Sequence, residues 1–172
     1  MTEICDRLIV CSQDEFNHID QSKSDYSIAF CAKHPFHQYL VGYKGNLPKT
    51  HPEYLIAKRP ERHMIAANLI DVDKDGFVSD TIIQELIDFI DKERESGRIV
   101  LLVCNQGVSR SSCVGLMYLL HIGMLKEYKS FFMLEQAYRE IYPRHNPSLG
   151  MQLYTARYWD KLRKMEEEIN HD

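Results

Sequence analysis

The sequence predicts an α/β fold, a central and mostly parallel sheet flanked by helices. Short apolar runs rich in β-branched residues recur along the chain, and the clearest spans residues 99–103, just after Gly97. Between these runs the apolar residues often follow helical spacing, as in residues 82–90. Strands that alternate with helices are typical of parallel sheets.

Further elements follow in order along the chain. Strands are expected over residues 7–12, 26–32 and 63–69. Helices are expected over residues 13–19, with Ser12 as the N-cap, and over residues 113–120 and 131–142. A last helix should begin after Ser148. Its expected inner face is Leu149, Leu153, Ala156, Trp159 and Leu162.

Composition limits the class of protein. The 172 residues favour one domain, and 44% hydrophobic with 27% charged residues is ordinary for a globular protein. The net charge of −4 makes nucleic acid an unlikely partner, and we expect no membrane partner, signal peptide or transmembrane span. Five cysteines without zinc-like spacing favour a reducing, cytoplasmic location. The oligomeric state stays open.

Residues 104–112 hold the most informative pattern, Cys-x5-Arg-Ser with a glycine three residues after the cysteine. This loop joins a strand to a helix N-terminus, so unpaired backbone N–H groups and the helix dipole create an anion site. Gly107 permits a close approach of the backbone, and Arg110 can donate to two oxygens of one phosphate. The positive potential of the amides and the helix dipole favours the thiolate form of Cys104. A thiolate beside a bound phosphate predicts nucleophilic attack on phosphorus.

This segment resembles the active-site loop of the cysteine-based protein tyrosine phosphatases, in particular their dual-specificity branch. The resemblance covers about residues 65–159; residues 1–63 diverge, and residues 160–172 form a charged helical tail of the same domain. It implies a phosphocysteine at Cys104 and a phosphate held by Arg110. The implied substrate-binding residues are Asn105, Gln106, Gly107, Val108, Ser109 and Ser111, the last hydrogen-bonded to the sulfur.

The chain departs from this family at one position. The family has a histidine directly before the cysteine, where it helps to hold the thiolate, and this chain has Val103.

The acidic stretch at residues 71–79 has two interpretations. A phosphatase needs a carboxylic acid that protonates the leaving oxygen, and an alignment without gaps to the family places it at Asp73, with Asp71 and Asp75 as alternatives. The stretch also matches the first nine positions of an EF-hand calcium loop. Position twelve is Ile82 instead of glutamate, and a strand is expected before Asp71, so the phosphatase loop is favoured.

The predicted function is hydrolysis of a phosphomonoester. The resemblance implies phosphotyrosine, phosphoserine or phosphothreonine in proteins as the substrate. The reaction is expected to need no metal or organic cofactor. One alternative is a catalytically weak or inactive phosphate-binding protein, which Val103 suggests. Another is a phosphatase for a small molecule, lipid or RNA 5′ end, whose pocket residues 34–62 would shape. Lys33, Lys58, Arg59 and Arg62 are candidate contacts to substrate charge. Cys31 is a candidate redox partner of Cys104.

Overall fold

The computed structural model of the protein describes residues 1–20 and 25–169. Over this part of the chain, six strands form one sheet in the order β1-β2-β6-β3-β5-β4. The strands are β1 (Thr2–Cys5), β2 (Leu8–Ser12), β3 (Tyr26–Phe30), β4 (Ile56–Arg59), β5 (Met64–Ala67) and β6 (Ile99–Cys104). The four inner strands are parallel, and the edge strands β1 and β4 pair antiparallel. The predicted α/β fold is therefore confirmed.

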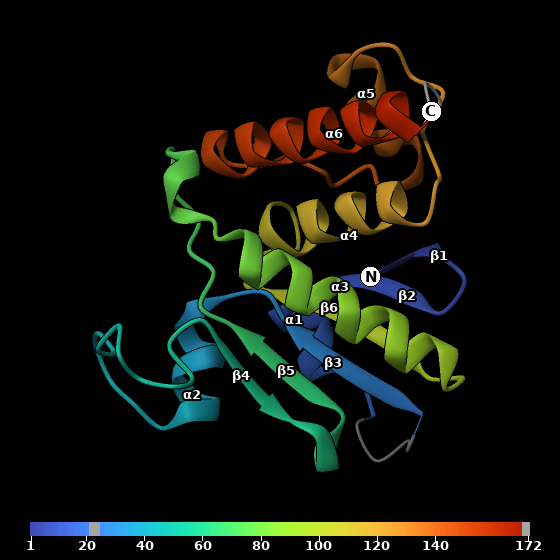
Figure 1. The fold of residues 1–172 in the computed structure, drawn as a ribbon. Helices are drawn as coiled ribbons and strands as arrows, with labels where there is room; N and C mark the ends of the chain where they lie inside the picture. Colours follow the sequence, from blue (N-terminus) through green and yellow to red (C-terminus); the bar gives the residue numbers. More distant parts are fainter. Residues whose placement is uncertain (21–24, 170–172) are drawn as a thin grey trace.

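Helices cover both faces of this sheet. Figure 1 shows α3 and α4 across one face, with α6 stacked over α4, and α1 on the side away from α3. The helices are α1 (Gln13–Asn17), α2 (Gln38–Val41), α3 (Asp80–Glu95), α4 (Arg110–His121), α5 (Phe131–Ile141) and α6 (Leu149–Ile169). Short helical turns add η1 (Lys33–His37), η2 (Pro60–Arg62) and η3 (Asp75–Phe77). No helix in the described ranges is long and apolar enough to cross a bilayer.

Strand β6 lies at the centre of the sheet, between β2 and β3. Its residues 100–104 are all buried, which explains its continuous apolar run. Residues 111–120 of α4 are buried as well, because this helix packs on the sheet and under α6. The connection from β6 to α4 is thus held between two buried elements.

The N-terminus of α1 forms as expected. The Ser12 side chain accepts from the Glu15 amide, and the Glu15 side chain accepts from the Ser12 amide, which is a capping box. Phe16 of α1 packs on Phe30 of β3, which stacks on Phe36 of η1 at 4.5 Å between ring centroids. This aromatic cluster fixes η1 close to the carboxyl end of β3.

The last helix differs from its predicted orientation. Leu149 and Leu153 are 51% and 44% exposed, whereas Met151 and Tyr154 are buried and Trp159 is buried as expected. Leu162 of the predicted face also packs against the core, so the inner face keeps Trp159 and Leu162 and includes Met151 and Tyr154 in place of Leu149 and Leu153. The predicted charged tail is helical through residue 169, and residues 170–172 lie outside the described range. Strands β1 and β4 had not been expected from the sequence.

Candidate active site

The loop of residues 105–109 leaves the carboxyl end of β6 and enters the first turn of α4. Gly107 has a φ of +75°, and a Cβ atom there would lie 2.9 Å from the backbone nitrogen of Ser12. A side chain would therefore collide with the end of β2, so only glycine fits at this position. The close packing on β2 fixes the shape of the loop.

Cys104 lies at the base of this loop, with 1% of its surface exposed. Its Sγ atom is 3.0 Å from the Ser111 hydroxyl and accepts from the Gly107 amide at 3.3 Å. Val103, which stands where the related loops have histidine, is fully buried in β6. The polar groups that face the sulfur therefore come from the loop and from the first turn of α4.

Three backbone carbonyls of the loop are held from outside by the segment after α5. They belong to Gln106, Gly107 and Val108. Their donors are Arg144 Nη2 at 2.8 Å, the Tyr142 hydroxyl at 2.7 Å and the Asn146 amide at 2.9 Å. These bonds hold the loop backbone in the shape in which the Gly107 amide meets the Cys104 sulfur.

Arg110 begins α4, and its side chain is only 12% exposed. Its Nη2 atom donates to the Asn105 side chain at 2.7 Å, and its Nε atom lies 3.4 Å from a carboxylate oxygen of Asp71. That geometry makes no hydrogen bond, so the buried Nε–H has no acceptor among the described residues. A phosphate oxygen would satisfy such a donor.

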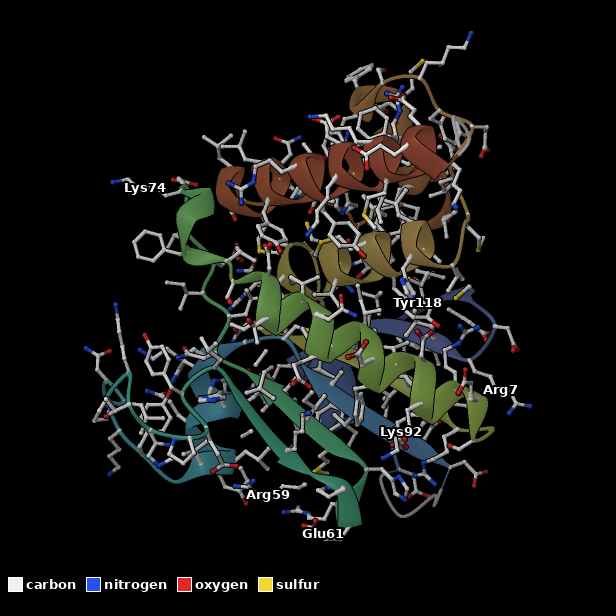
Figure 2. All side chains as sticks on the ribbon, in the orientation of Figure 1. Arg7, Arg59, Glu61, Lys74, Lys92 and Tyr118 are labelled. Carbon is white, nitrogen blue, oxygen red and sulfur yellow. The ribbon has the colours of Figure 1, made fainter. Side chains whose placement is uncertain are left out.

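The acidic loop brings Asp71 to this site. Asp71 Oδ1 accepts from the Ser109 hydroxyl at 2.8 Å, while its other oxygen faces Arg110. Asp73 is exposed, and within the described ranges it makes no hydrogen bond or ion pair. The neighbouring Lys74 points away from the body of the molecule (Figure 2). The side chain of Asp75 is outside the described part.

The acidic loop packs on the first turn of α6. The Gly150 amide donates to the Val72 carbonyl at 3.1 Å, and a Cβ atom on Gly150 would lie 2.2 Å from that oxygen. Sequence reasoning had missed this role. The available signal was a lone glycine inside a helical pattern, which costs about 1 kcal/mol relative to alanine and therefore suggests a packing reason.

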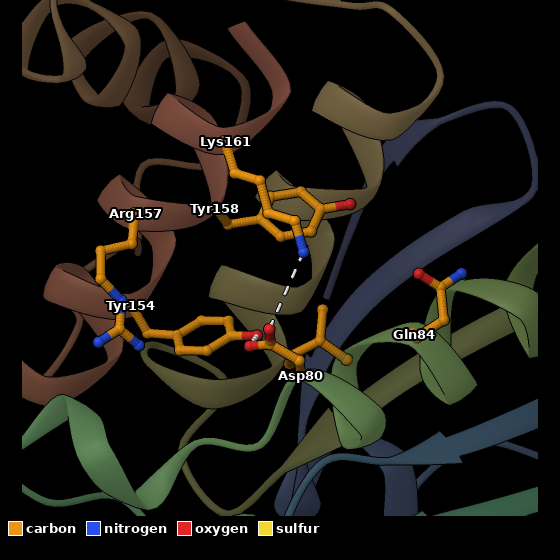
Figure 3. A pocket seen from close by; sticks show the side chains of 7 residues that line it. Asp80, Gln84, Tyr154, Arg157, Tyr158 and Lys161 are labelled. Carbon is orange, nitrogen blue, oxygen red and sulfur yellow. Dashed lines mark hydrogen bonds and ion pairs between the residues drawn. The ribbon is translucent and has the colours of Figure 1, made fainter. Parts of the chain in front are cut away.

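The far end of the acidic loop is fastened to the same helix. Asp80, the first residue of α3, accepts from the Tyr154 hydroxyl at 2.7 Å and lies 3.9 Å from Lys161 Nζ. Figure 3 shows these side chains meeting in a pocket between α3 and α6. Helix α6 thus holds the acidic loop at both of its ends.

The calcium-loop interpretation does not fit the local structure. An EF-hand needs a helix before its first ligand, and strand β5 precedes Asp71. The described residues contain no group of three histidine, cysteine, aspartate or glutamate side chains that could hold a metal ion.

Of the four basic residues suggested as substrate contacts, only Lys33 lies near this site. Its amide donates to the Leu69 carbonyl, two residues before Asp71. Lys58 is paired with Glu85, and Arg59 is paired with Glu53. Arg62 lies in the turn between β4 and β5. This turn is at the amino-terminal end of the parallel strands, opposite the loop that follows β6.

The class of cysteine-based phosphatases is defined by three features in sequence. These are a cysteine at the end of a central strand, an anion-binding loop, and an arginine at the N-terminus of the next helix. The family model for the dual specificity phosphatase catalytic domain matches residues 22–158 of this chain. The chain therefore belongs to the dual-specificity phosphatase family. No curated protein sequence matches it significantly.

Solved structures show the same fold at low sequence identity. DUSP15 is 17% identical with a TM-score of 0.62, over 98% of this chain and 95% of that one. Human DUSP28 is 14% identical with a TM-score of 0.61, over 94% and 93% of the two chains. PTPMT1, solved in complex with PI(5)P, is 13% identical with a TM-score of 0.61, over 95% and 97%.

Proposed function

We propose that this protein hydrolyses phosphomonoesters through a phosphocysteine intermediate on Cys104. The observation that carries the proposal is the convergence of a buried thiol, loop amides and the unsatisfied Nε–H of Arg110. The amides of residues 105–110 and Arg110 bind the three non-bridging oxygens. They stabilise the charge of the transition state.

Two displacements at phosphorus complete the reaction. The Cys104 thiolate attacks, the P–S bond forms, the P–O ester bond breaks, and a carboxylic acid protonates the departing alcohol. Water then attacks the phosphocysteine while the carboxylate accepts its proton, so that phosphate leaves and the thiolate returns. The Ser111 hydroxyl, 3.0 Å from the sulfur, stabilises the thiolate as it departs.

We assign the acid role to Asp71 in preference to Asp73, which the alignment without gaps had favoured. Asp71 contacts two loop residues, Ser109 and Arg110, whereas Asp73 makes no such contacts among the described residues. A bound phosphate would engage Arg110 and bring negative charge toward Asp71. Asp71 would then lie beside the bound phosphate, where a carboxylic acid can meet the departing oxygen.

By resemblance to this family, we propose phosphotyrosine, phosphoserine or phosphothreonine in proteins as the substrate class. No metal or organic cofactor enters the proposed steps, because the arginine and the loop amides supply the positive potential that the phosphate requires.

Hydrolysis of para-nitrophenyl phosphate tests the proposal. The wild-type protein should turn over this substrate, and Cys104→Ser should not, although it should still bind phosphate because the loop is intact. Arg110→Lys should also be severely impaired, since a point charge cannot replace the planar guanidinium. Full activity in Cys104→Ser would exclude the cysteine as nucleophile, and an inactive wild type would favour a phosphate-binding protein without catalysis.

A leaving-group series assigns the acid. Asp71→Asn should lose about 10²–10⁴-fold in kcat/KM on alkyl phosphates and much less on para-nitrophenyl phosphate, whose leaving group needs no proton. Asp73→Asn is the matched control and should behave like the wild type. The reverse pattern would return the role to Asp73.

A further inference from the structure

The support segment, residues 142–146, holds three carbonyls of the catalytic loop and contains a buried histidine. His145 lies between Arg144 and Asn146, which donate to two of those carbonyls, and its side chain is only 1% exposed. A polar ring that is buried in this way needs hydrogen-bond partners inside the protein. The partners of His145 therefore determine how firmly the support segment is fixed.

One edge of the His145 ring meets the first turn of α4. Its Nδ1 atom lies 2.7 Å from the hydroxyl of the buried Ser112. The Tyr138 hydroxyl donates to the Ser112 carbonyl at 2.9 Å, and the Tyr138 ring packs edge-on against the imidazole at 4.9 Å between centroids. Ser112 directly follows Ser111, whose hydroxyl lies 3.0 Å from the Cys104 sulfur. The ring thus joins the support segment to the helical turn that contacts the sulfur.

The opposite edge of the ring faces a buried carboxylate. His145 Nε2 lies 3.5 Å from Oε1 of Glu135 in α5, and this nitrogen has no hydrogen bond among the described residues. Burial opposes ionisation of Glu135, but the His145 ring and the Gln152 amide lower its pKa, so that it is a carboxylate at neutral pH. Attraction to this charge orients the imidazole with its Nδ1 atom toward Ser112.

The geometry of the loop depends on the support segment. Val103, directly before Cys104, is apolar and fully buried, so the strand offers the loop no polar side chain at this point. Gly107 contributes the amide that meets the sulfur at 3.3 Å, and its carbonyl accepts from the Tyr142 hydroxyl at 2.7 Å. The His145 amide in turn donates to the Tyr142 carbonyl at 3.0 Å. A shift of the support segment would therefore move an amide that faces the nucleophile and a bound phosphate.

We propose that His145 is a positioning residue of the proposed active site, which holds the loop after Cys104 in its phosphate-binding shape through contacts with Ser112 and Glu135. The inference rests on the proposed function, because the phosphate bound in that loop would be the reacting group. His145 is buried behind the loop and does not touch the substrate. Loss of its polar contacts should weaken phosphate binding and turnover together, whereas a purely structural residue would change stability alone.

Calorimetry with inorganic phosphate and turnover of para-nitrophenyl phosphate test this inference. His145→Leu keeps most of the volume but loses both polar contacts, and its phosphate affinity and kcat/KM should each fall about tenfold, roughly the cost of one buried hydrogen bond. His145→Asn provides a polar atom near the position of Nδ1 and should retain most of both. Ser112→Ala should reproduce the loss, and its addition to His145→Leu should cost little more, because both changes break one link.

Thr155→Val is the matched control for these variants. Thr155 is also a buried polar residue, but its hydroxyl donates within α6, to the Met151 carbonyl at 2.8 Å. The control should lower the melting temperature and keep both the phosphate affinity and kcat/KM.

The outcomes separate the inference from the proposed function. Wild-type phosphate affinity in folded His145→Leu and Ser112→Ala, or an equal loss in Thr155→Val, would overturn the inference even if the wild type hydrolyses para-nitrophenyl phosphate. Fully additive losses in the double variant would also overturn it. A wild type that binds phosphate without turnover would refute the proposed function, and the calorimetric comparison would still decide the inference. If His145→Leu does not fold, Ser112→Ala and His145→Asn carry the same comparison.

Discussion

Substitution of Gly150 by alanine should uncouple the acidic loop from the catalytic loop. The added Cβ would lie 2.2 Å from the Val72 carbonyl oxygen and 2.7 Å from that of Lys74. A carbon–oxygen contact needs about 3.3 Å, so the loop must move by about 1 Å. Because both obstacles are backbone atoms, no side-chain rotation relieves the collision.

A displacement of this size can cost about 100-fold in rate when it moves a catalytic group. We expect that loss in kcat/KM on an alkyl phosphate, which needs the acid, and a much smaller loss on para-nitrophenyl phosphate. The melting temperature should change little, because alanine raises the helix propensity of α6 by about 1 kcal/mol and offsets part of the strain.

Gly76→Ala provides the matched control for this prediction. Gly76 follows on the same acidic loop, and a Cβ there would meet no atom within 4 Å. It should keep wild-type activity on both substrates. If folded Gly150→Ala retains full activity on the alkyl phosphate, or loses both activities equally, the proposed coupling through Val72 is refuted.

Two further predictions concern stability and oxidation. Partial burial opposes ionisation of Glu15, but hydrogen bonds from the amino terminus, a backbone amide and an arginine lower its pKa from 4.5 to about 2. Glu15→Gln should therefore lower the free energy of unfolding near neutral pH. The difference between the variant and the wild type should disappear as the pH falls toward about 2. Chemical denaturation of both proteins at both pH values measures it. Peroxide should convert Cys104 to a sulfenic acid, which the Cys31 thiol attacks to form a disulfide and release water. The ladder between β3 and β6 ends at the pair Phe30 and Val103, and Cys31 and Cys104 are the residues that follow. At the usual spacing between strands of about 4.8 Å, their Cα atoms would meet the requirement for a disulfide. Because burial raises the pKa of Cys31, the crosslink should form faster as the pH rises. Mass spectrometry that finds Cys104 joined to Cys11 instead, or activity that dithiothreitol restores equally in Cys31→Ser, would contradict this pairing.

Local patterns in the sequence were sufficient for the central strand, the loop and the helix that follow one another from β6 to α4. Their residues lie close together in the chain, and both flanking elements are buried on most sides, so the apolar runs are clear. Strands β1 and β4 were missed because they are short edge strands with little alternation. Their pairing depends on partners that the local sequence does not reveal.

Contacts between distant segments account for the other differences. The hydrogen bond between Tyr142 and Gly107 joins residues 35 positions apart, and no local pattern encodes it. The last helix carries apolar residues on more than one face, and its packing against distant segments such as the acidic loop at Gly150 is not visible in the local pattern. The same contact holds the acidic loop against α6, and no local pattern in the sequence encodes it.

Detection of the covalent intermediate tests the central claim most directly. Asp71→Asn and, in parallel, Asp73→Asn would be mixed with para-nitrophenyl phosphate and quenched in acid, and their peptides would be analysed by mass spectrometry. We expect a burst of nitrophenol equal to the enzyme concentration and one phosphoryl group on the peptide that carries Cys104. This phosphorylated peptide should be more abundant in Asp71→Asn than in Asp73→Asn, because hydrolysis of the intermediate is slowed. Sustained turnover with no phosphoryl group on that peptide, or with the group on another residue, would contradict a phosphocysteine mechanism.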